Sequence, residues 1–315
     1  MSTHGLQWYP WKGEKSVLNE TSLNVLSREW NADILRISMY PDESDYKCNT
    51  DHYHVMIDTL VDEVLKRGMY CIIDWHMLSP GDPWYNIEHA KRFFARMSSQ
   101  HGKKRFVIYE ICNEPNSNGH DPDDKPCDGS SPEPKGKSPT WQRIKSYAEQ
   151  IIPIIRANDP DGLIIVGTPA WSSLGISDDT PSGDDILENR LSGEFAHNVL
   201  YSFHFYAKSH NEPKRRTEFE KFAKELPIFV SEWGSQEDSG DGINDFVSTV
   251  EWLKLLDRFH ISACNWNYSN DERSGAVWKE DTSPDGRFTD SELKEAGVFV
   301  KKWIQRAPDW ELSPS

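Results

Sequence analysis

The stretch Val107-Ile108-Tyr109-Glu110-Ile111-Cys112-Asn113-Glu114-Pro115 is an apolar run that stops on an Asn-Glu pair followed by proline. A run of this kind is typical of a parallel strand that is buried on both faces. A carboxylate where such a strand ends is a candidate catalytic group, because the chemistry of α/β barrels gathers at the carboxyl ends of their strands. The stretch therefore predicts a buried strand that presents Glu114.

Similar apolar runs recur along the chain and alternate with segments of helical periodicity. Runs typical of strands cover 4–9, 34–40, 70–76, 163–167, 199–206, 227–234 and 261–266. Apolar residues recur at helical spacing in 52–67, 87–97, 141–155, 218–225, 246–256 and 291–305. This alternation predicts an α/β fold, a (β/α)₈ TIM barrel, built as a single domain over residues 1–315.

Two segments interrupt this regular pattern. Residues 117–140 are rich in proline and polar side chains and predict a long loop insertion after the strand that carries Glu114. Pro153 lies inside the periodic segment 141–155, where it predicts a helix that is bent or interrupted.

Composition limits the partners. The net charge of −16 disfavours nucleic acid and anionic membranes, which would be repelled over most of the surface. No apolar run approaches the roughly 20 residues that span a bilayer, and residues 1–5 carry no signal-peptide pattern. Cys48 and Cys127 lie in polar loops, so a disulfide between them is left open, and no CxxC spacing indicates a zinc knuckle.

Polar and aromatic side chains stand at the ends of most of the predicted strands. In a barrel these ends converge on one mouth, although they are far apart in sequence. The residues at these ends are Arg36, His76, Asn113, Glu114, His204, Tyr206, Glu232 and Trp266. A pair of glutamates across one mouth is what glycosidic cleavage needs, because one must protonate the leaving oxygen while the other attacks or activates water.

The two glutamates need different environments to play different roles. Arg36 and the hydroxyl of Tyr206 are suited to stabilise a charged Glu232, and we expect that charge to raise the pKa of Glu114. This assigns Glu232 as nucleophile and Glu114 as acid.

The strand-end motifs also resemble those of glycoside hydrolase family 5, and the chain as a whole resembles its bacterial endo-β-1,4-glucanases (cellulases). The motifs are His4-Gly5-Leu6-Gln7-Trp8, Arg36 to Tyr40, Asp74-Trp75-His76, Asn113-Glu114-Pro115-Asn116, His204-Phe205-Tyr206, Ser231-Glu232-Trp233-Gly234 and Trp266-Asn267. They follow one another in the family's order over nearly the full chain.

The resemblance implies a retaining mechanism, in which Glu232 forms a glycosyl-enzyme intermediate and Glu114 serves first as acid and then as base. It implies that Asn113 holds the sugar 2-hydroxyl. It further implies that His4, Trp8, Tyr40 and Trp266 line the non-reducing-side subsites and that Trp171 stacks on the leaving side. A retaining pair has its carboxyl groups roughly 5–5.5 Å apart, whereas a separation near about 9 Å would indicate inversion.

The segment after Trp266 departs from the family pattern. Relatives are expected to carry a lysine there, near a glucosyl subsite, but residues 267–273 contain none, although Glu272 matches its neighbour. The resemblance also implies a secreted, extracellular protein. Because Met1 begins inside what resembles the first strand, we expect a signal peptide or capping segment before it.

Other functions are compatible with parts of this pattern. The same machinery could cleave mannan, xyloglucan or xylan instead of cellulose, and a non-catalytic carbohydrate-binding barrel would keep only the aromatic groove. A metal-dependent hydrolase would use His4, His76 and His204, but the assigned glutamates leave no acidic ligand for the ion. We therefore expect a monomeric enzyme with a β-glucan polysaccharide substrate and no metal or other cofactor.

Overall fold

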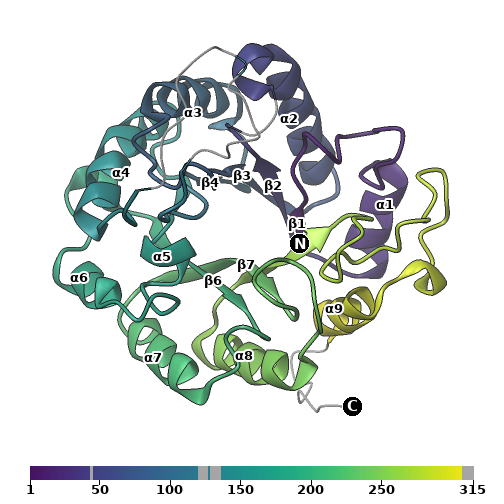
Figure 1. Cartoon of the computed structure of the whole chain (residues 1–315). Helices are drawn as coiled ribbons and strands as arrows, with labels where there is room; N and C mark the ends of the chain where they lie inside the picture. Colours follow the sequence, from purple (N-terminus) through teal and green to yellow (C-terminus); the bar gives the residue numbers. More distant parts are fainter. Residues whose placement is uncertain (43–44, 120–126, 128–135, 307–315) are drawn as a thin grey trace.

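The computed structural model describes residues 1–42, 45–119, 127 and 136–306. In this part of the chain, eight parallel strands close into a barrel in sequence order, and helices surround it (Figure 1). The predicted (β/α)₈ TIM barrel is thus confirmed. The strands are β1 (Ser2–Thr3), β2 (Ile34–Met39), β3 (Tyr70–Trp75), β4 (Val107–Glu110), β5 (Leu163–Val166), β6 (Val199–Tyr206), β7 (Ile228–Gly234) and β8 (Ala263–Tyr268).

The helices form an outer ring and bury one face each against the strands (Figure 1). In α3, for example, Ala90, Phe93, Phe94 and Met97 are fully buried, at the spacing that places them on one side of a helix. The α-helices are α1 (Glu20–Asn24), α2 (Thr50–Leu65), α3 (Ile87–His101), α4 (Trp141–Arg156), α5 (Pro169–Ser172), α6 (Ser182–Glu188), α7 (Pro213–Ala223), α8 (Phe246–Phe259) and α9 (Glu295–Gln305).

Three elements differ from the sequence-based expectation. The first strand is β1 (Ser2–Thr3), and residues 4–9, where a strand was expected, form a turn instead. Helix α4 continues through Pro153 up to Arg156, so the helix is not interrupted there. Strand β4 ends at Glu110, four residues before Glu114. The chain beyond β4 nevertheless stays beside the segment that follows β3, because the backbone N–H of Asn113 donates to the carbonyl of Trp75 at 3.1 Å. Glu114 is therefore held by its neighbours although it lies outside the regular strand.

The barrel interior changes from apolar to charged along the strands. An apolar group fills the end where the strands begin, and it consists of Ile72, Ile108, Ile165, Phe229 and Cys264. Because side chains two apart in a strand share a face, the interior positions after Ile72 and Ile108 are Asp74 and Glu110, which are register partners on β3 and β4. The fold thus places carboxylates deep in the barrel, below its mouth.

Strand β7 contains one extra residue relative to both of its neighbours. Ser202 and His204 of β6, two residues apart, pair with Phe229 and Glu232 of β7, three residues apart, and the register with β8 shifts in the same place. This is the pattern of a β-bulge. Its consequence is that consecutive residues, Ser231 and Glu232, both turn into the barrel.

Cys48 and Cys127 form a disulfide bond, which decides the pairing that the sequence left open. Most of the predicted loop insertion, residues 120–126 and 128–135 of the range 117–140, lies outside the described residues. Within the described residues, no helix combines the length and apolar character needed to cross a membrane.

Candidate active site

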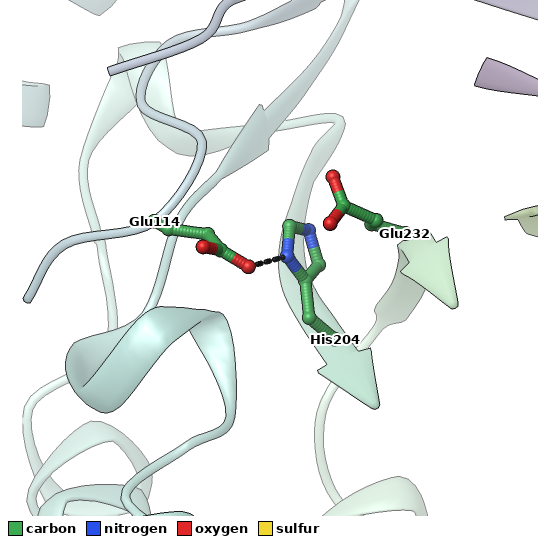
Figure 2. A group of neighbouring side chains, drawn as sticks. All are labelled: Glu114, His204 and Glu232. Atoms are coloured by element: carbon green, nitrogen blue, oxygen red, sulfur yellow. Dashed lines mark hydrogen bonds and ion pairs between the residues drawn. The ribbon is translucent and has the colours of Figure 1, made fainter. Parts of the chain in front are cut away.

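Glu114 and Glu232 face each other at the mouth of the barrel, with His204 between them (Figure 2). A carboxylate oxygen of each glutamate and a ring nitrogen of His204 all lie within 4.8 Å of one another. All three side chains are buried. Segments 118 positions apart in the sequence thus meet at a single site, as the barrel topology requires.

Arg36 on β2 lies at the centre of the charged interior. Its guanidinium contacts Glu110 (Nε to Oε2, 2.6 Å), Glu232 (Nη1 to Oε2, 3.0 Å) and Asp74 (Nη2 to Oδ2, 3.0 Å), and it is fully buried. Burial lowers the pKa of Arg36, but these three carboxylates together raise it well above its usual value. Arg36 therefore remains a cation that three buried carboxylates share.

Replacing Arg36 with methionine should lower the free energy of unfolding by about 3–5 kcal/mol, because it leaves buried carboxylates without their counter-ion. The pKa values of those carboxylates would then rise in the folded state, so the loss should shrink as the pH falls toward about 5. Urea unfolding at several pH values would measure this. The control is Arg258→Met, which removes a partly exposed ion pair with Glu220 and should cost less than about 1 kcal/mol. Similar losses for both variants would contradict the argument.

Both oxygens of Glu232 are held by neighbouring side chains. The hydroxyl of Tyr206 donates to Oε1 at 2.5 Å, and Arg36 donates to Oε2 at 3.0 Å. Hydrogen bonds donated to a carboxylate stabilise its charged form and fix its orientation. The structure thus places Arg36 and Tyr206 where the sequence analysis expected them.

Glu114 has a different environment. Burial raises the pKa of Glu114 to about 8, and the charges of Asp74, Glu110 and Asp238 add to this effect, while Arg36 opposes it. The main cause is therefore loss of hydration, not the charge of Glu232 that the sequence analysis invoked. A carboxyl group with this pKa is protonated at neutral pH and can donate a proton.

His204 and His76 connect the glutamates to the strands around them. His204 lies 2.7 Å from Glu114 through Nδ1, and burial lowers its pKa to about 4, so its ring is neutral. His76 binds Asp74 through Nδ1 at 2.6 Å and lies 3.3 Å from the amide nitrogen of Asn113 through Nε2. Arg36 also donates to the side-chain oxygen of Asn113 at 2.6 Å, so this amide is held from both ends.

Aromatic rings line the mouth beside Glu232. Tyr40 packs edge-on against Trp8 at 4.9 Å between ring centroids, and His76 stacks on Trp266 at 5.1 Å. His4 lies 5.5 Å from the ring of Trp266. Trp8 is 46% exposed, whereas Trp266 is 7% exposed. These rings form one connected group with a solvent-facing edge.

Trp171 and Glu272 lie apart from that group. The backbone N–H of Trp171 donates to the carbonyl of Pro115 at 3.1 Å, which places this half-buried residue on the Glu114 side. Glu272 is exposed, and its carbonyl accepts a hydrogen bond from Lys294 Nζ at 2.9 Å. Lys294 Nζ also donates to the backbone carbonyls of Asp271 and Arg273, so it holds the loop after β8 in place.

The sequence profile of the family described as Cellulase (glycosyl hydrolase family 5) matches residues 1–272 of this chain. The chain belongs to glycosyl hydrolase family 5. It is 42% identical over 97% of its length to the endoglucanase MaCel5A of Microbulbifer sp. (strain ALW1), and 41% identical over 97% to the endoglucanase E-5 of Thermobifida fusca.

Solved structures agree with this family 5 assignment. The crystal structure of the catalytic domain of the Thermobifida fusca endoglucanase Cel5A (E5) has a TM-score of 0.84 and 40% identity, covering 97% of this chain and 90% of that domain. A substituted form of the same domain, in complex with cellotetraose, has a TM-score of 0.84 at 39% identity over the same shares of both chains. The chain spans only 54% and 59% of the lengths of the two curated relatives.

Three residues of this family 5 site were missed by the reasoning from sequence: Asp74, Glu110 and Ser231. Asp74 and Glu110 each interrupt a buried apolar strand, and an ionisable residue in such a run is a signal that could have identified them. Ser231 carries no comparable signal, because only the bulge in β7 turns it inward.

Among the described residues, Glu114, His204 and Glu232 form a group whose ligand atoms could approach one ion. Their polar atoms already have partners, since Glu114 binds His204, and Tyr206 and Arg36 occupy the two oxygens of Glu232. A cation would also be repelled by the adjacent Arg36. The chemistry of this donor set therefore suits proton transfer better than metal binding.

Proposed function

We propose that this chain is a retaining endo-β-1,4-glucanase that hydrolyses internal bonds of cellulose or related β-glucans. The observation that carries the proposal is the pair Glu114 and Glu232, whose carboxylate oxygens approach within 4.8 Å and whose environments differ. An approach this close between the nearest oxygens supports the short spacing of retaining enzymes over the wider gap of roughly 6.5–9.5 Å that inverting enzymes need for water. The names of the relatives, which are endoglucanases, support the same reaction.

The reaction proceeds by double displacement. Glu232 attacks the anomeric carbon while Glu114 gives its proton to the departing glycosidic oxygen, which leaves a glycosyl ester on Glu232. Water then attacks the same carbon, Glu114 accepts its proton, and the ester bond to Glu232 breaks. The contacts of Arg36 and Tyr206 keep Glu232 charged and oriented for attack.

The surrounding side chains bind and align the sugar chain. The amide of Asn113 is fixed by Arg36 and His76, which suits it to hold the 2-hydroxyl group. Ring faces and edges for the non-reducing side of the sugar chain come from His4, Trp8, Tyr40 and Trp266. Glu272 lies nearby on the loop after β8. Trp171 serves the leaving side. Aromatic rings suit this task because pyranose rings present flat apolar faces.

Release of reducing ends from cellulose, mannan, xyloglucan and xylan tests this proposal. We expect the highest kcat/KM on cellulose or mixed-linkage glucan, with a mixture of oligosaccharides as early products. A higher kcat/KM on mannan, xyloglucan or xylan would mean that the enzyme uses the same mechanism on that polymer instead of cellulose. Binding to glucan without release of reducing ends would favour the non-catalytic carbohydrate-binding alternative.

We also propose that the protein acts outside the cell, because an insoluble polymer cannot enter it. The disulfide between Cys48 and Cys127 supports this location, since such bonds persist in oxidising compartments. The monomeric state expected from the sequence stays a prediction.

A further inference from the structure

A continuous series of hydrogen bonds leads from Glu114 to Glu110, a buried carboxylate with no step in the double displacement. Glu114 Oε1 lies 2.7 Å from His204 Nδ1, and His204 Nε2 lies 2.8 Å from Ser231 Oγ. Ser231 Oγ donates to Glu110 Oε1 at 2.6 Å. On the other oxygen, Glu110 accepts a hydrogen bond from Arg36 Nε at 2.6 Å.

Ser231 decides the direction of this series because a hydroxyl has one proton and two acceptor positions. Its neighbours are Glu110 Oε1, His204 Nε2 and the hydroxyl of Ser202 at 2.6 Å. Burial raises the pKa of Glu110, but the guanidinium of Arg36, 2.6 Å from its Oε2, opposes this and stabilises the ionised form. An ionised Glu110 can only accept, so it takes the single proton of Ser231. Ser231 must then accept from both Ser202 and His204.

The tautomer of His204 follows from this arrangement. The neutral ring carries one proton, and the bond to Ser231 requires it on Nε2. Nδ1 is then an unprotonated acceptor that faces Glu114 Oε1. A carboxylate there would oppose the lone pair of Nδ1, whereas a protonated carboxyl group donates to it.

We propose that Glu110 is a positioning residue that acts through Ser231 to fix the tautomer of His204 and so holds Glu114 in its protonated form. The inference rests on the proposed role of Glu114 as acid. It assigns a function to the bulge in β7, since only that extra residue turns Ser231 toward Glu110 while Glu232 still faces Arg36.

Other charged groups also act on this series and enter the design of the test. Glu114 interacts with Arg36, Asp74, Glu110 and Asp238, and His204 interacts with Arg36, Glu110 and Glu232 and acts in turn on His76. Tyr206 interacts with both Glu114 and Glu232. Removing the charge of Glu110 would therefore change the pKa of Glu114 through space as well as through Ser231, and an experiment must separate the two effects.

The substitution Glu110→Gln keeps the size of the side chain but reverses the direction in which the hydrogen bonds of the series are donated. Arg36 Nε requires an acceptor, so the amide oxygen faces Arg36 and the amide NH₂ faces Ser231. Ser231 then donates to His204 Nε2, the ring proton moves to Nδ1, and Nδ1–H stabilises the carboxylate form of Glu114. We expect the basic limb of the kcat/KM profile to move to lower pH by about one unit or more.

Ser231→Ala provides the matched background for this substitution. If the effect runs through Ser231, Glu110→Gln should shift the basic limb of the Ser231→Ala enzyme far less than that of the wild type. An equal shift in both backgrounds would show that the effect acts purely through space, and it would overturn the proposal. The proposal would also be overturned if Glu110→Gln lowered kcat but left the basic limb of the kcat/KM profile at its wild-type pH.

A second measurement needs no catalysis, and its decisive arm uses the wild-type protein alone. The ¹⁵N chemical shifts of His204 in the wild-type protein at neutral pH should identify Nε2 as the protonated nitrogen, and Nδ1 in Glu110→Gln. A proton on Nδ1 in the wild type would overturn the inference. If the wild type hydrolyses none of the polysaccharides, the proposed function fails, but this tautomer assignment is still decided.

Discussion

Replacing Glu232 with alanine is expected to abolish hydrolysis of soluble cellulose, lowering kcat by about 10⁴-fold or more. The reason is that, among the residues that the structure describes, neither Glu114 nor Glu110 is placed to take over the attack on the anomeric carbon. In the proposed mechanism Glu114 serves the leaving group, and it is bound to His204, whereas Glu110 is fully buried below the mouth. Reducing-end assays at equal protein concentration would measure the loss.

The same variant offers a direct test of the nucleophilic role. Removing the side chain of Glu232 opens space for a small anion such as azide, which should restore turnover of an activated aryl cellobioside and yield a glycosyl azide of inverted configuration. The matched control is Glu251→Ala on the outer face of α8, where a half-exposed glutamate pairs with Lys254. Wild-type rates in Glu232→Ala, or no rescue by azide, would remove Glu232 from the role of nucleophile.

Replacing Glu114 with glutamine should lower kcat/KM on cellulose by about 10³-fold, because the departing sugar oxygen then receives no proton. An aryl cellobioside with an acidic phenol as leaving group needs little protonation, so formation of the glycosyl-enzyme should be much less affected. A pre-steady-state burst of phenol followed by slow turnover would measure this difference. Equal losses on both substrates would contradict the role of Glu114 as acid.

The pH dependence checks the same assignment. Burial raises the pKa of Glu114 to about 8, so the acid form persists through neutral pH and is lost as the pH rises past that value. The kcat/KM of the wild type on cellulose should therefore fall above about pH 8. That basic limb should be absent from the profile of Glu114→Gln on the activated substrate.

Much of the fold could be predicted because each strand and helix carries its own periodic pattern. The run 107–110 is apolar at every position but one, as expected of a strand buried on both faces, and α3 shows one clear apolar side. The interruption expected at Pro153 was wrong, because tertiary packing overrides the local pattern there. Helix α4 tolerates Pro153 because six buried residues on its inner face, Trp141, Ile144, Tyr147, Ala148, Ile151 and Ile152, anchor the turns before it.

Of the site, the sequence indicated the residues at the strand ends but not their mutual contacts. Glu114 and Glu232 were recognisable because each follows an apolar run, and the (β/α)₈ topology brings such ends together. The cause of the raised pKa of Glu114 was not recognisable. Burial depends on how completely the neighbouring segments exclude water, and no single stretch of the chain carries that information.

The sequence by itself determined the barrel, the pair of glutamates and the arginine beside Glu232, because strand periodicity and barrel closure are properties of local pattern and chain order. Only the tertiary structure decided the disulfide partner of Cys48 and the hydrogen-bond series from Glu114 to Glu110. In a regular strand Ser231 and Glu232 would point to opposite faces. The bulge in β7, defined by pairing with β6 and β8, turns both inward, and pairing between distant strands is not encoded in either strand alone.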